Sequence, residues 1–282
     1  MKKEPALSRR RFLLGASVGL LALSFSVPFA ASERTEVKRV EVALPGLPKE
    51  LDGLTIAHIS DLHYGFGKFR NADAVEEVKA VVMAQSPELI VFTGDLLDHT
   101  ADPDWASIPL LKGLKAPLGV YAVLGNHDRH FDIRALKKSF DDAGVELLLN
   151  QSVGLRRNGH AFWVIGLDDP LTGSPDMERA TASVPSEDFR LLLVHAPDFV
   201  PRAAHFGIPL QLSGHSHGGQ IRLPGIGPLI LPPLGKEFPM GLRHVPGTGT
   251  HVYTTCGLGT SIVPLRLFCR PEVTLLVLRS HT

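Results

Sequence analysis

The chain has 282 residues, of which 44% are hydrophobic and 21% are charged. Lys and Arg together number 29, as do Asp and Glu, so the net charge of zero gives no indication of a nucleic-acid partner. A body of roughly 250 residues buries about three quarters of its unfolded surface, and such a fold needs no disulfide or structural metal for its stability.

The N-terminus has the composition of a targeting segment. Residues 1–11 carry five cations and one acid, and the following 20 residues, Phe12 to Ala31, carry no charge. Ser8-Arg9-Arg10-Arg11-Phe12-Leu13 resembles the twin-arginine export signal. We therefore expect residues 1–32 to be a twin-arginine-like signal peptide or an N-terminal membrane anchor, since the uncharged stretch is about long enough to span a bilayer as a helix. Both alternatives place a single domain, residues 33–282, in the periplasm, the cell envelope or on the extracellular face.

Short apolar runs bounded by turn residues indicate strands in the body of the chain, and apolar residues three or four apart indicate helices. The strands are expected at 35–44, 54–60, 88–93, 119–124, 146–149, 155–157, 161–167, 189–194, 209–213, 252–255 and 273–278. The helices are expected at 71–84, with Asn71 or Asp73 as the N-cap, and at 109–115, 133–143 and 177–183. Because a strand, a helix and a second strand in succession favour a parallel crossover, the pattern predicts an α/β fold around a mixed sheet.

Polar side chains follow five of the expected strands at the point where each strand ends. These residues are Asp61, His63, Asp95, Asn126, His127, Asp128, His195, His215 and His217. Carboxylate, amide and imidazole groups without a thiolate suit Mn²⁺, Fe or Zn²⁺, and the residue types do not choose among these metals. Seven of these residues are plausible ligands, too many for one tetrahedral ion, so we expect two divalent ions that share a bridging carboxylate.

These segments resemble the full motif set of the calcineurin-like metallophosphoesterases. The motifs are Asp61-x-His63, Gly94-Asp95, Gly125-Asn126-His127-Asp128, His195 and Gly214-His215-x-His217, and the resemblance covers residues 54–278. Gly218-Gly219-Gln220, the segment 257–261 and the twin-arginine-like start further resemble a bacterial exported or membrane-anchored branch of that family. The resemblance implies a two-sheet sandwich of mixed β-sheets flanked by helices, with a dimetal site at the carboxyl ends of the strands.

The resemblance also implies a role for each residue. The first ion would be held by Asp61, His63 and His217, and the second by Asn126, His195 and His215. Asp95 would bridge the two ions. His127, held by Asp128, would sit by the substrate rather than on a metal and would protonate the leaving oxygen or stabilise the transition state. The ions would convert a water to hydroxide that attacks the phosphorus, so the implied activity is that of a metal-dependent phosphoric ester hydrolase.

The motifs indicate the reaction and leave the substrate open, so no substrate-binding residue is assigned. We expect a phosphodiester or a phosphomonoester as substrate, and the twin-arginine export machinery and a membrane as partners. The apolar stretch 223–240 is interpreted as a packed loop in preference to an exposed rim for a lipid-linked substrate or a membrane. One alternative function is that of a UDP-2,3-diacylglucosamine pyrophosphatase-like hydrolase in lipid A synthesis, which requires a body facing the cytoplasm. Another is that of a non-catalytic protein that binds metal or cell-wall polymer.

Three further features have both a structural and a functional interpretation, and the structural one is favoured for each. For Cys256 and Cys269, buried thiols without a catalytic role are favoured over a disulfide, which export would permit. His58 lies inside an apolar run and is expected to be a core residue. Lys68 and Arg70 are interpreted as solvated charges in preference to phosphate ligands.

Overall fold

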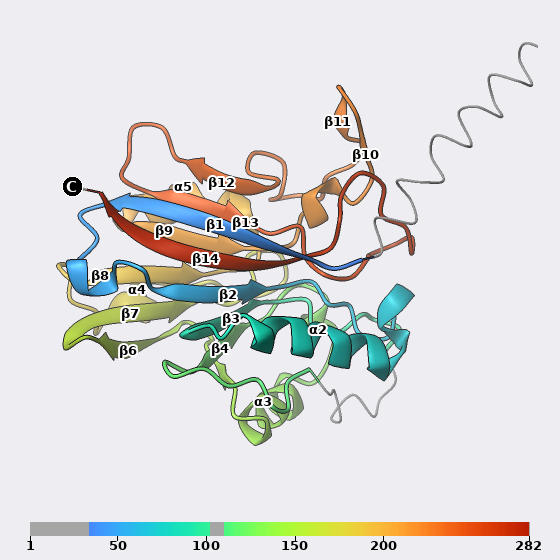
Figure 1. Cartoon of the computed structure of the whole chain (residues 1–282), viewed down its shortest axis with the longest axis horizontal. Coiled ribbons are helices and arrows are strands. Elements are labelled where there is room, and N and C mark those ends of the chain that lie inside the picture. Colours follow the sequence, from blue (N-terminus) through green and yellow to red (C-terminus); the bar gives the residue numbers. More distant parts are fainter. Residues whose placement is uncertain (1–33, 102–109, 282) are drawn as a thin grey trace, which may run out of the picture.

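The computed structural model describes residues 34–101 and 110–281. In this part of the chain two six-stranded mixed sheets stack face to face, with helices on their outer sides (Figure 1). This is the two-sheet α/β sandwich expected from the sequence. The expected signal peptide or anchor over residues 1–32 lies outside the described residues. Among the residues that are described, none belongs to a helix long and apolar enough to cross a membrane.

The first sheet combines parallel and antiparallel pairing. Four of its strands are mutually parallel, and the C-terminal strand pairs antiparallel with one of them and parallel with the N-terminal strand. In order across the sheet the strands are β1 (Glu36–Pro45), β14 (Glu272–His281), β2 (Thr55–Ile59), β3 (Leu89–Thr93), β4 (Val120–Val123) and β5 (Glu146–Leu147). Within residues 34–101 and 110–281, the first and last strands therefore pair with each other.

The second sheet has four parallel strands with one antiparallel strand at each edge. In order across the sheet they are β12 (Gly241–His244), β13 (His251–Thr254), β9 (Leu210–Ser213), β8 (Phe189–Leu193), β7 (His160–Gly166) and β6 (Gln151–Arg157). A separate hairpin of β10 (Arg222–Leu223) and β11 (Gly227–Pro228) stands away from both sheets (Figure 1). The sequence pattern did not predict this hairpin or β12.

The helices confirm most of the sequence expectations. They are α2 (Ala72–Ala84), α3 (Ile133–Asp142), α4 (Met177–Thr181) and α5 (Val200–His205), of which α5 was not predicted. Asn71 is the N-cap of α2, because its side chain accepts a hydrogen bond from the backbone N–H of Asp73 at 2.9 Å. The helix expected at 109–115 is wrong for its described part, which forms a turn over residues 110–113. That turn ends at Gly113, whose φ of 96° is incompatible with a right-handed helix.

The core has one layer between the sheets and one on the outer side of each sheet. On β2, Ile56 packs between the sheets, whereas Ala57 and Ile59 belong to the outer cluster that includes α2 and α3. On β8, Leu191 packs between the sheets and Leu192 packs against α4 and α5. Successive side chains of a strand point to opposite faces, so strands buried on both faces appear in the sequence as continuous apolar runs.

Candidate metal centre

The polar residues expected to bind metal lie where the central strands of both sheets end. In the first sheet, β2 leads into Asp61, β3 into Asp95 and β4 into Asn126. In the second sheet, β8 leads into His195 and β9 into His215 and His217. Backbone hydrogen bonds join neighbouring ends within each sheet, from Asp61 N–H to the carbonyl of Gly94 at 2.9 Å and from Gly214 N–H to the carbonyl of His195 at 3.0 Å.

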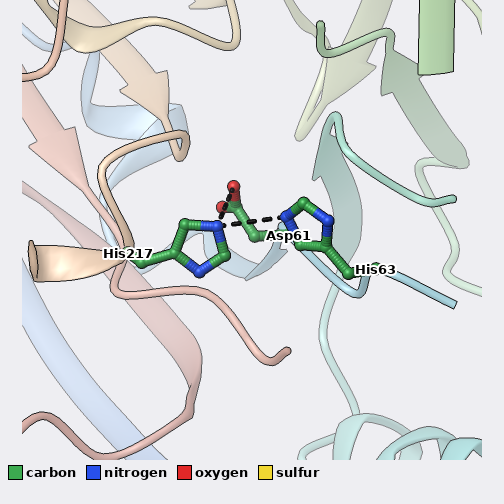
Figure 2. Close-up of side chains that lie close together, drawn as sticks. All are labelled: Asp61, His63 and His217. Carbon is green, nitrogen blue, oxygen red and sulfur yellow. Dashed lines mark hydrogen bonds and ion pairs between the residues drawn. The ribbon is translucent and has the colours of Figure 1, made fainter. Parts of the chain in front are cut away.

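A first cluster consists of Asp61, His63 and His217, whose ligand atoms all lie within 4.8 Å of one another. The two rings approach from opposite sheets, with the carboxylate of Asp61 beside them (Figure 2). Nε2 of His63 lies 3.1 Å from Nε2 of His217, which in turn lies 3.6 Å from Oδ1 of Asp61. All three side chains are buried. The expected ligands of the first ion are therefore together.

A second cluster consists of Asp95, His195 and His215, again with ligand atoms within 4.8 Å of one another. Oδ2 of Asp95 lies 3.2 Å from Nε2 of His195 and 3.5 Å from Nε2 of His63, a member of the first cluster. Asp95 thus stands between the two clusters. This position is the one that a carboxylate shared by two ions requires.

The hydrogen bonds of the second cluster leave ligand atoms without a partner. Nδ1 of His195 donates to the carbonyl of Thr93 at 2.6 Å, and Nε2 of His215 donates to the carbonyl of Pro233 at 2.8 Å. Among the described residues, Oδ1 of Asn126 is buried and has no hydrogen-bond partner, and Nε2 of His195 lies near Oδ2 of Asp95 but forms no hydrogen bond of normal geometry. Buried polar atoms of native proteins are normally satisfied, so these two atoms fit a bound cation.

The electrostatics of His195 also favour positive charge at this place. Burial by itself lowers the pKa of the His195 imidazole, but the carboxylate of Asp95 outweighs burial and raises the pKa to about 10. Without a metal ion, a proton on the His195 ring supplies this positive charge. A bound metal ion would supply it instead, because an imidazole ring must be neutral to bind a metal.

The first cluster is tied together by polar contacts whose direction can be assigned. The guanidinium of buried Arg266 lies 3.3 Å from Nδ1 of His217, and Nδ1 of His63 lies 3.4 Å from Oδ2 of Asp98. A guanidinium only donates and a carboxylate only accepts, so the 3.1 Å contact between the rings runs from Nε2–H of His217 to Nε2 of His63. A metal ion held by both rings would replace that proton. Arg266 and Asp98 lie outside the sequence motifs and were not predicted as part of the site.

The backbone around the ligands is unusual. Five of the seven expected ligands have a positive φ, between 49° and 68°, which is uncommon for residues other than glycine. These five are Asp61, His63, Asp95, His215 and His217. A Cβ atom at Gly125 would lie 2.2 Å from Oδ1 of Asp95, and one at Gly214 would lie 2.2 Å from Oδ2 of Asp61. The glycines of these motifs therefore make room for the carboxylates, and such strain is found at functional sites.

The surroundings of His127 differ from the expectation in one respect. The two carboxylate oxygens of Asp128 accept the backbone N–H groups of Leu97 and Gly125, each at 3.0 Å. The ring of His127 instead has Nδ1 3.7 Å from Oδ2 of Asp98. The expectation that Asp128 holds His127 is therefore corrected, because its carboxylate is turned to the backbone of the two loops. Burial, with the charge of Asp95, raises the pKa of Asp128 to about 7.

The remaining residues noted in the sequence have the structural or surface roles that were favoured for them. His58 is fully buried, with Nε2 2.8 Å from Oγ1 of Thr93, which confirms a core role. Lys68 pairs with Glu77 at 3.2 Å on the surface. Cys256 and Cys269 are free and buried, and the thiol of Cys269 donates to the carbonyl of His217.

A two-sheet α/β sandwich whose strand ends bring together two His and Asp clusters around one carboxylate defines a dinuclear metallohydrolase. The sequence model of the calcineurin-like phosphoesterases matches residues 54–219, more than half of the chain. The chain belongs to that family and is a metal-dependent phosphoric ester hydrolase. The family uses two metal ions, and the clusters described above provide ligands for them.

Relatives of this chain span its whole length. An uncharacterized metallophosphoesterase of Bacillus subtilis, YkuE, is 36% identical over 296 aligned positions that cover 99% of both chains. The phosphodiesterase YaeI of Escherichia coli is 29% identical and covers 96% of this chain and 99% of its own. Among solved structures, a 5'-nucleotidase precursor from Thermus thermophilus has a TM-score of 0.47 at 14% identity, covering 79% of this chain and 54% of that one. The last likeness is too distant to bear on function.

Proposed function

We propose that the chain hydrolyses a phosphodiester or a phosphomonoester with Asp61, His63 and His217 on one ion and Asn126, His195 and His215 on the other. Asp95 is the shared ligand in this proposal. The observation that carries it is the position of Asp95, whose Oδ2 lies within 3.5 Å of a histidine nitrogen from each cluster. When bound, the two ions supply Lewis acidity toward the phosphoryl oxygens and lower the pKa of a water in the site.

His127 is the proton donor to the leaving oxygen in this proposal. Its side chain is 21% exposed, whereas the side chains of His63, His195 and His217 are at most 8% exposed. Burial lowers the pKa of His127, and the carboxylates of Asp95 and Asp98 partly offset that effect. With Nδ1 directed at Asp98, Nε2 is the atom left to pass a proton to the departing oxygen, after which the ring is neutral.

Turnover of chromogenic phosphodiesters and phosphomonoesters, assayed with Mn²⁺ and with a chelator, tests this function. We expect activity that the chelator abolishes and added Mn²⁺ restores. His127→Ala should keep its metal content and lose about 10²–10⁴-fold in kcat, the usual contribution of general acid catalysis. His205→Ala, an exposed histidine on α5, is the matched control and should retain full activity. A metal-loaded protein that turns over none of these substrates would contradict the proposal.

We further propose that the body is exported by the twin-arginine route and stays in or near the membrane. The support is compositional: a basic start with Arg9-Arg10-Arg11 followed by 20 uncharged residues. Replacing Arg9 and Arg10 by lysine keeps the charge and removes the guanidinium pair. We expect this variant to accumulate in the cytoplasm in a fractionation experiment, while Lys2→Arg, the control, is exported. Equal export of both variants would exclude this route.

A further inference from the structure

Exposed apolar side chains gather on one face of the molecule. Nine large hydrophobic residues are exposed in the described part of the chain, and seven of them come from two segments. These seven, which we call the apolar rim, are Ile226, Leu229, Ile230, Leu234, Ile262, Val263 and Phe268. Ile226, Ile230 and Ile262 are 73%, 79% and 89% exposed. A cluster of this kind is typical of an interaction surface, whereas scattered single residues are not.

The two segments that carry the apolar rim are joined to each other. The β10–β11 hairpin meets the loop before β14 where Arg222 N–H donates to the carbonyl of Leu267 at 2.9 Å. The side-chain amide of Gln220 donates to the carbonyls of Ser261 and Val263 at 3.2 and 2.9 Å. The rim is therefore one surface built on the segment that follows the ligand His217, which corrects the packed-loop interpretation for its exposed residues.

The backbone holds three rim residues in an unfavourable conformation. Leu234, Ile262 and Phe268 have φ values of 60°, 67° and 52°. A left-handed conformation is costly for a β-branched residue such as isoleucine, by about 1–3 kcal/mol. The side chain of Ile262 is exposed, so burial within the chain does not offset this conformational cost. Contact with a partner surface would explain why an apolar residue stands there.

Positive charge surrounds the apolar rim, although the net charge of the whole chain is zero. Segments 220–240 and 257–271 carry the rim, and residues of 64–70 lie across a cavity from the second of them. Apart from buried Arg266, the charged residues of these three segments are five cations and one acid. The cations are Lys68, Arg70, Arg222, Lys236 and Arg270, and the acid is Glu237. Lys68 and Arg270 pair with Glu77 and Glu36 at 3.2 and 3.8 Å, which are exposed pairs of little strength.

The chain enters the domain next to this face. The N–H of Glu36 donates to the carbonyl of Pro271 at 2.9 Å, so β1 begins against the loop that carries Ile262 and Phe268. In Figure 1 that loop, the start of β1 and the β10–β11 hairpin lie at the same end of the molecule. Ala31, the end of the uncharged stretch, is five residues before Glu36. Whatever its conformation, a chain of that length reaches at most about 17 Å.

We propose that the apolar rim and its cations dock on an anionic lipid bilayer. Apolar side chains enter the interface while Lys and Arg contact the headgroups, which is how peripheral proteins bind such surfaces. When residues up to Ala31 are anchored in a membrane, the short connection to Glu36 keeps the apolar rim close to that membrane. The docking goes beyond phosphoesterase activity and does not depend on it.

A cavity of about 370 Å³ adjoins the loop that carries Ile262 and Val263. Phe66, Lys68, Arg70, Thr260 and Leu265 are among the residues that line it. The N–H of Gly259, also in its lining, donates to the carbonyl of Asp61, a ligand of the first cluster, at 2.7 Å. The lining of this cavity, which is apolar and cationic, thus adjoins both the loop of the proposed membrane face and the metal centre.

A polarity-sensitive fluorophore placed on the rim of the full chain tests the proposal. The label is attached to Ile262→Cys, since the two native thiols are buried, and the matched control is the same label on Leu171→Cys, an exposed apolar position outside the rim. Each protein is reconstituted with phosphatidylcholine vesicles with and without phosphatidylglycerol. Turnover of a soluble chromogenic ester checks that both labelled chains are folded.

We expect a blue shift at position 262 that is larger with phosphatidylglycerol and smaller at high salt, and no shift at position 171. Arg70→Glu and Lys236→Glu should weaken the response, with each lost cation worth about fivefold in partitioning, whereas Lys138→Glu on α3 should not. A label at 262 that reports water in every vesicle overturns the proposal. A blue shift already present without lipid also overturns it, because the rim is then covered by the chain itself or by a second copy.

Discussion

Nδ1 of His127 lies 3.7 Å from Oδ2 of Asp98, and the same oxygen lies 3.4 Å from Nδ1 of His63. One buried carboxylate therefore supports both the proposed proton donor and a proposed metal ligand. Among the described residues this oxygen forms no hydrogen bond of normal geometry, while the second oxygen of Asp98 accepts from Thr100. Burial raises the pKa of Asp98, but the nearby ring of His63 and the hydrogen bonds from Thr100 outweigh burial and hold the pKa well below its usual range, so the carboxylate is ionised.

Asp98→Asn tests this shared support. The amide keeps the shape of the side chain and removes the negative charge that orients the two rings. We expect kcat to fall and the Mn²⁺ concentration at half-maximal activity to rise about 10–100-fold, as is usual when a group behind a metal ligand is lost. Titrating the variant with Mn²⁺ measures both effects. Unchanged values of kcat and metal requirement would mean that Asp98 serves neither ring.

Asp95→Asn tests the shared ligand. An amide can still accept the N–H of His127, which donates to Oδ1 of Asp95 at 2.9 Å, but it cannot offer two charged oxygens to two ions. We expect elemental analysis to find two ions in the wild-type chain and fewer in the variant, with activity lost in parallel. Asp142→Asn, an exposed pair with Lys138, is the control and should keep both ions. A variant that retains the full metal content would show that the ions do not share this residue.

Asp128→Asn separates a structural role from a catalytic one. The carboxylate accepts the backbone N–H groups of Leu97 and Gly125 and is buried, so an amide in its place satisfies only one of them well. An unsatisfied buried donor costs about 1–3 kcal/mol, and we expect a loss of that size in denaturant unfolding. The folded fraction should keep most of its kcat. A large loss of kcat without a loss of stability would restore the catalytic role first assigned to Asp128.

His58 makes the domain sensitive to acid. Burial lowers its pKa from 6.5 to about 3, so the unfolded chain binds a proton at this position below pH 6.5 while the folded chain stays neutral. Stability therefore falls as the pH drops from 6.5 toward 3, by up to about 1.4 kcal/mol per pH unit. His58→Gln still reaches Thr93 by a hydrogen bond and does not titrate, so its free energy of unfolding should fall less steeply over this window. An equally steep loss, measured by urea unfolding at a series of pH values, would assign the acid sensitivity elsewhere.

The sequence by itself was enough for most of the fold and for a list of candidate ligands that the structure brings together. Buried parallel strands are continuous apolar runs, and a strand that ends in a candidate ligand shows the change from apolar to polar residues directly, as at Asp61 and His195. Asn71, one of the two N-cap candidates, likewise stands where a helix N-cap is favoured. Such signals are local, because they depend on residues a few positions apart.

Only the tertiary structure decided which side chains meet inside the site. Asp128 adjoins His127 in sequence, yet the turn after β4 directs its carboxylate to the backbone of Leu97, and Asp98 takes the place by the ring. Arg266 reaches His217 across 49 residues of sequence, and the rim forms because Gln220 is bonded to the loop at Ser261. Contacts of this kind depend on how two sheets and their loops come together in space. The periodicity of the sequence gives no information about that arrangement.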